Sequence, residues 1–144
     1  MMNYELIENI TSADIAVRVK APSLSLLFKY GAEALMSEMI EDILSVKKSV
    51  SKTGSIEGTD LSLVYFEFLN EFLFFKDAEN LLLLPDEIAV SCAEGLYICS
   101  FTLTGEKIDR AVHQFRVDIK AVTLHALALY EENGVFIAES VFDV

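Results

Sequence analysis

The residues best suited to chemistry lie near the end of the chain. The run 119–125 brings Lys120, Thr123 and His125 together in a pattern typical of a strand. The sequence then ends at Asp143 and Val144, after alternating apolar residues that should hold the tail in a sheet. Hard divalent cations bind clusters of carboxylate oxygens, so we expect a cation site here. The alternative is an ordinary edge strand with a solvated aspartate.

Other catalytic signatures are missing. The sequence has no phosphate-binding glycine loop, no paired-histidine zinc motif and no serine-nucleophile motif. Its two histidines, His113 and His125, are each expected to be structural side chains. Cys92 and Cys99 would be diagonal neighbours across a hairpin, roughly 7–8 Å apart, which is too far for an easy disulfide. We therefore expect both cysteines to be small core residues.

Length and charge limit the class of protein. The chain has 144 residues, enough for one domain over 1–144 with its own core. Its net charge of −12 disfavours direct nucleic-acid binding and favours a basic protein partner or bound cations, although acidity also maintains solubility. No apolar run is long enough to cross a bilayer and no signal-peptide pattern is visible. We expect a cytoplasmic protein without membrane contact.

The first half of the chain predicts a strand followed by a helix. Apolar residues alternate over 14–20 and leave Asp14 on the polar face of that strand. Ser23 is a suitable N-cap for a helix that should end near residues 41–42. The polar segment 47–58 could be a loop or an exposed strand pair.

The second half predicts another helix and then a run of strands. A helix starting after Thr59 or Asp60 is apolar nearly all round, so it should pack on more than one side. Glu94–Gly95 predicts one hairpin turn, and Asn133–Gly134 predicts another between 121–130 and 135–144. Helices and strands in this order indicate an α+β fold.

Short motifs occur in a fixed order along almost the whole chain. The most specific are Ile-Lys-Ala-Val-Thr-Leu-His at 119–125 and Val-Phe-Asp-Val at 141–144. They resemble Ile-Lys-Ala-Val-Thr-Tyr-His and the terminal Val-Leu-Asp-Ile of the archeases, small proteins that assist the RNA ligase of tRNA splicing. Weaker matches lie at 11–15, 23–28, 39–41 and 68–73. Thr11 stands where the family has a histidine, and Phe68 stands where it commonly has a tryptophan.

The archease resemblance implies a fold and a site. The fold would be a mixed-sheet α+β domain with two main helices and a strand–helix–strand–strand core. A divalent cation, calcium, magnesium or manganese, would be bound by Asp14, Asp143 and the carboxylate of Val144. If the strands that carry these groups are neighbours, the carboxylates converge and repel, so a cation or protonation is needed to settle them. Other motif residues expected to border the site are Glu41, Lys120 and His125.

The resemblance also implies a function. The protein would be an activator, not an enzyme, that promotes guanylylation and multiple turnover of a GTP- and metal-dependent RNA-splicing ligase, its partner in tRNA splicing or RNA repair. One alternative is a metal-dependent hydrolase built from Asp14, Asp143 and His125. Another is an acidic interaction module that needs no metal. Exposed strand edges or the apolar second helix could support a homo-oligomer.

Overall fold

The structure, a computed structural model, describes residues 3–7 and 14–144. Within them the chain forms eight strands and two α-helices, arranged in two sheets. In chain order the elements are β1 (Tyr4–Ile7), β2 (Asp14–Ala21), α1 (Leu24–Met39), a 3-10 turn (Ile43–Ser45), β3 (Val50–Gly58), α2 (Leu61–Glu79), β4 (Leu81–Ala93), β5 (Leu96–Lys107), β6 (Ala121–Val122), β7 (Ala128–Glu132) and β8 (Val135–Asp143).

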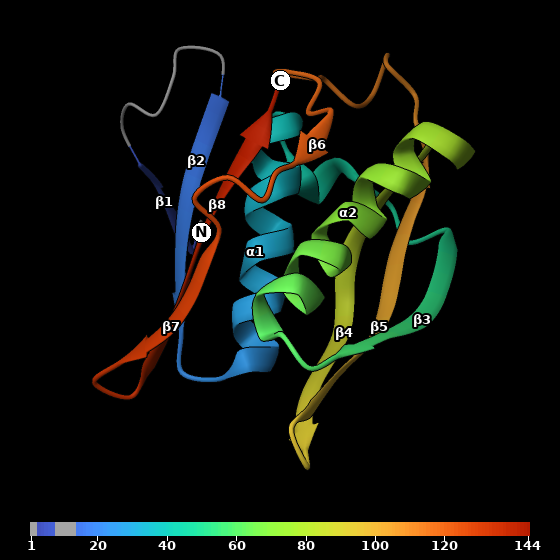
Figure 1. Cartoon of the computed structure of the whole chain (residues 1–144). Helices are drawn as coiled ribbons and strands as arrows, with labels where there is room; N and C mark the ends of the chain where they lie inside the picture. Colours follow the sequence, from blue (N-terminus) through green and yellow to red (C-terminus); the bar gives the residue numbers. More distant parts are fainter. Residues whose placement is uncertain (1–2, 8–13) are drawn as a thin grey trace.

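The strands form two separate sheets. One sheet has the order β1-β2-β8-β6, with β7 also paired to β8, and the other has the order β3-β5-β4. Helix α1 lies between β2 and β8 on one side and β4 on the other, while α2 covers the smaller sheet (Figure 1). The α+β prediction is confirmed. The resemblance implied a mixed sheet, whereas every pairing among the described strands is antiparallel.

The first strand and helix form for the predicted reasons. Val17 and Val19 are fully buried on the face of β2 that meets the core, as the alternation indicated. The hydroxyl of Ser23 accepts a hydrogen bond from the Leu26 N–H at 3.2 Å and caps α1. Because β2 and α1 run in opposite directions, the end of α1 returns to the end of the sheet at which Asp14 lies (Figure 1).

The second helix packs on more than one side, as expected. Asp60 caps it by accepting the Ser62 N–H at 2.9 Å. The ring of Phe68 then meets Phe28 of α1 at 5.5 Å and Phe101 of β5 at 5.8 Å between centroids. These ring contacts join α2 to α1 and to the smaller sheet in one core. No helix in residues 3–7 and 14–144 is long and apolar enough to cross a membrane.

Both predicted hairpins are present. Their turns use left-handed backbone at Glu94 (φ 52°) and Gly95 (φ 78°), and at Asn133 (φ 54°) and Gly134 (φ 80°). The segment 47–58, left open between a loop and a strand pair, contains the single edge strand β3.

Two predictions are corrected. The run 119–125 is not one strand: β6 stops at Val122, and a turn over 124–127 with left-handed Ala126 (φ 56°) precedes β7. Cys99 is buried as expected, but Cys92 is exposed, because the β4–β5 hairpin extends past the helices that cover its base. Both cysteines are free.

Candidate functional site

Two aspartates face each other where strands β2 and β8 meet. Asp14 begins β2, Asp143 ends β8, and the register makes them direct partners. Directly opposed residues of an antiparallel pair point to the same face of the sheet. The next pair, Ile15 and Phe142, therefore points to the opposite face, and Phe142 is fully buried there. Both carboxylates thus share the outer face, where Asp143 is exposed.

The tail that carries Asp143 is held on its other side by β6. Ala121 is the register partner of Asp143 on this side, and the Lys120 N–H donates to the Asp143 carbonyl at 2.8 Å. Val144 is half-buried and packs against the core. Residues 141–144 are therefore pinned to the sheet, as the alternating pattern predicted.

The donor atoms at this position fit a hard cation. Asp14 and Asp143 offer carboxylate oxygens, and such donors suit calcium, magnesium or manganese. Like charges directly opposite on neighbouring strands destabilise a sheet, so a cation would offset their repulsion. Across the described ranges no three His, Cys, Asp or Glu side chains form a metal-binding group.

The remaining predicted residues are dispersed. Glu41 follows α1 at the same end of the molecule, where its N–H donates to the Gln114 carbonyl at 2.8 Å and its carboxylate lies 4.0 Å from the Arg116 guanidinium. Lys120 precedes β6, and its side chain is exposed. His125 lies in the exposed turn after β6, not on a strand beside the aspartates. Thr11, which replaces the family histidine, falls outside the described residues.

Two side chains on α2 that position the site were not predicted. The ammonium of Lys76, which is only 5% exposed, lies 2.5 Å from Asp118 and 3.0 Å from the Ile119 carbonyl. The Asn70 amide oxygen accepts the Val122 N–H at 3.3 Å. Together they anchor the segment that leads into β6. A lysine at a core position of an apolar helix was the available signal.

His113 is structural, as predicted. It is buried, and its Nδ1 accepts the Asp109 N–H at 3.0 Å, so its Nε2 carries the proton toward Glu106 at 2.8 Å. The pKa of Glu106 is lowered by the Lys47 N–H bond and then by His113. The bonds of His113 to Asp109 and Glu106 hold the loop that follows β5.

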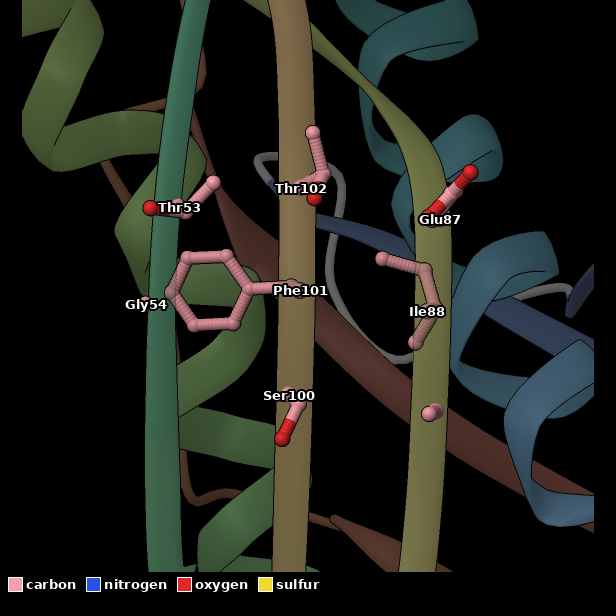
Figure 2. Close-up of a pocket in the computed structure, with 8 residues that line it drawn as sticks. Thr53, Gly54, Glu87, Ile88, Ser100, Phe101 and Thr102 are labelled. Carbon is pink, nitrogen blue, oxygen red and sulfur yellow. The ribbon is translucent and has the colours of Figure 1, made fainter.

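A hollow of about 490 Å³ lies on the smaller sheet, away from the paired aspartates (Figure 2). The ring of Phe101 extends from β5 toward Gly54 on β3, and a side chain at Gly54 would meet that ring at 2.7 Å. Its polar groups are mainly hydroxyls, with Glu87 as its one carboxylate. It lacks a convergent cation-binding set.

Comparison with known proteins identifies the family. The chain matches the archease protein family over residues 4–144. It is 30% identical over 143 residues to protein archease of Methanopyrus kandleri, covering 99% of this chain and 100% of that protein. It is 29% identical over 134 residues to protein archease of Pyrococcus furiosus, covering 92% and 94%.

Two solved structures share the fold. The solution structure of Methanobacterium thermoautotrophicum protein 1598 has a TM-score of 0.85 at 24% identity and full coverage of both chains. A crystal structure of an archease from Thermotoga maritima, described as a possible chaperone, has a TM-score of 0.59 at 18% identity and covers 97% of this chain and 98% of that one. Since the family match spans nearly all of the sequence, this chain belongs to the archease family.

Proposed function

We propose that this protein is a non-catalytic activator of a GTP- and metal-dependent RNA ligase. It promotes guanylylation of the ligase and repeated turnover in tRNA splicing or RNA repair. The proposal is supported by membership of the archease family and by the chemistry of the paired strand ends. The net charge of −12 suits a basic protein partner better than a phosphate backbone.

The observation that carries the proposal is the direct pairing of Asp14 with Asp143. Two carboxylates on one exposed face, beside the last residue of the sequence, form an oxygen-rich tip suited to a calcium, magnesium or manganese ion. Such an ion would supply positive charge beside the phosphates of a bound nucleotide. The chain itself orients the ligands, because β6 and β2 clamp Asp143 from both sides.

The test is guanylylation of the RNA ligase from the same source, measured as transfer of labelled GMP to the ligase. Wild-type protein should raise the amount of guanylylated ligase, and Asp143→Asn should not. Glu132→Gln is the matched control, since it removes the same charge from an exposed position on β7. Two glycines added after Val144 should also abolish activation, because they move the main-chain carboxylate away from the aspartates.

Other outcomes identify the alternatives. Full activation by Asp143→Asn, together with no cation binding in calorimetry, would contradict the cation site and favour an acidic docking module. Phosphoester hydrolysis by the purified protein alone, lost in Asp14→Ala, would favour a hydrolase.

A further inference from the structure

A groove of about 760 Å³ runs along the outer side of α2. Its floor is one face of that helix, and β3 and β6 lie on either side of it (Figure 1). The lining residues are Ser55, Ile56, Glu57, Phe66, Glu67, Asn70, Glu71, Phe74, Ala121 and Val122.

The floor of this groove exposes large apolar side chains. Phe74 is 56% exposed, and Leu63, which is 46% exposed, lies on the same helix face at a spacing of eleven residues. Phe66 lies between them and is half-buried. An exposed apolar stripe on a helix marks a contact surface more often than a scattered single residue does. This stripe accounts for the apolar residues of α2 that are not buried in the core.

The lining of the groove is acidic as well as apolar. Glu57, Glu67 and Glu71 line it, and no lysine or arginine does. None of the ion pairs formed within the described residues includes these three glutamates. Burial, and then the negative charge of the neighbouring Glu67, raise the pKa of Glu71. A cationic group of a partner would find three acidic side chains along the groove.

The groove ends beside the paired aspartates. Ala121, in its β6 wall, is the register partner of Asp143, and Asn70 in its floor is bonded to the Val122 N–H at 3.3 Å. A segment lying along α2 would therefore bring the rest of its protein to the oxygen-rich tip. The contact surface and the cation site would then act on one partner.

We propose that this groove docks an amphipathic segment of the RNA ligase, with apolar side chains facing Phe74 and Leu63 and flanking lysines or arginines facing the three glutamates. This inference rests on the proposed function. Apolar anchors rimmed by complementary charge are typical of helix-in-groove recognition. The groove sets affinity, whereas the cation site sets the activity of the bound complex.

The test is the concentration of this protein that gives half-maximal turnover of the ligase. Phe74→Ser, and separately the double variant Glu67→Lys with Glu71→Lys, should raise this concentration about tenfold and leave the plateau unchanged. The control is Glu131→Lys with Glu132→Lys, which makes the same change of charge on the exposed β7 hairpin. Asp143→Asn should instead lower the plateau. Circular dichroism and the melting temperature establish that each variant is folded. If the double variant is not folded, the result for Phe74→Ser alone tests the groove assignment.

The outcomes separate the two proposals. If the wild-type protein activates the ligase and the groove variants have its half-maximal concentration, the groove assignment is overturned and the proposed function stands. If the wild-type protein does not activate an active ligase, the proposed function fails and the groove assignment fails with it. A tenfold rise for both groove variants, absent from the control, supports the assignment.

Discussion

Asp14 of β2 and Asp143 of β8 lie directly opposite each other at the end of the larger sheet. Like charges opposed on neighbouring strands repel, and a shared cation would offset that repulsion. Natural sheets more often place a polar or oppositely charged residue at such a position. The repulsion is understandable if the two carboxylates share a cation.

Calcium or manganese should therefore stabilise the folded protein. At a cation concentration of 100 times Kd the free energy of unfolding should rise by about 2.7 kcal/mol, since the folded state alone presents the assembled ligands. Differential scanning fluorimetry with and without the cation measures this as a rise in Tm. An equal rise in Asp143→Asn would contradict the assigned site.

In EDTA the same substitution should act in the opposite direction. Asp143→Asn removes one of the two charges that the strand register places opposite each other, so the metal-free variant should gain about 0.2–1 kcal/mol in unfolding free energy. Urea unfolding of both proteins in EDTA is the measurement. A loss of stability of similar size would show that the charge of Asp143 is satisfied without a cation.

Lys76 should be more important for stability than its partner Asp118. Lys76→Met keeps the aliphatic length but leaves the Ile119 carbonyl without its 3.0 Å donor, at a cost of about 1–3 kcal/mol. Asp118 is 64% exposed, so Asp118→Asn should cost about 1 kcal/mol or less. Urea unfolding compares the two variants. Equal losses would mean that the ion pair, and not the bond to the carbonyl, holds this segment.

Gly31 should tolerate no side chain. A Cβ at this position would lie 2.8 Å from the Cζ atom of buried Tyr65 and closer still to its hydroxyl. Gly31→Ala should therefore cost about 1–3 kcal/mol by overpacking, measured by urea unfolding. Adding Tyr65→Phe should recover part of the loss, because it removes the nearest atom. An alanine variant as stable as the wild type would refute this packing.

Acid should weaken the loop after β5 through Glu106. Its folded pKa lies below the ordinary value of 4.5, chiefly through the Lys47 N–H bond and then His113. The stabilisation is therefore fully present above about pH 4.5 and is lost as pH falls through the folded pKa. Urea midpoints measured from about pH 6 down to about pH 3 should fall less steeply for Glu106→Gln than for the wild type. Parallel curves for the two proteins would rule out this contribution.

Local signals in the sequence predicted much of the fold. The caps at Ser23 and Asp60 and the turns at Glu94–Gly95 and Asn133–Gly134 depend on residues with strong conformational preferences. The break after Val122 was missed because the left-handed residue in its turn is Ala126, which has no such preference. Alternation also says which face is buried but not which strands pair, so the division into two sheets could not be derived from it.

The site was only partly predictable. Alternation predicted that Asp14 lies on the polar face of its strand. Its position opposite Asp143 could not be predicted, because it depends on a pairing between strands far apart in the sequence. His125 was expected near the site because it falls in a family motif, whereas the structure places it in the exposed turn after β6. The roles of Lys76 and Asn70 were not predicted, because contacts to a segment distant in the sequence leave no local periodicity.

The most direct test of the account is multiple-turnover RNA ligation by limiting ligase from the same source, with GTP and a divalent metal, in the presence and absence of this protein. The account predicts that each ligase molecule completes many ligations with the wild-type protein and only a few without it or with Asp143→Asn. Equal numbers of ligations with and without the wild-type protein, from a ligase shown to be active, would contradict it.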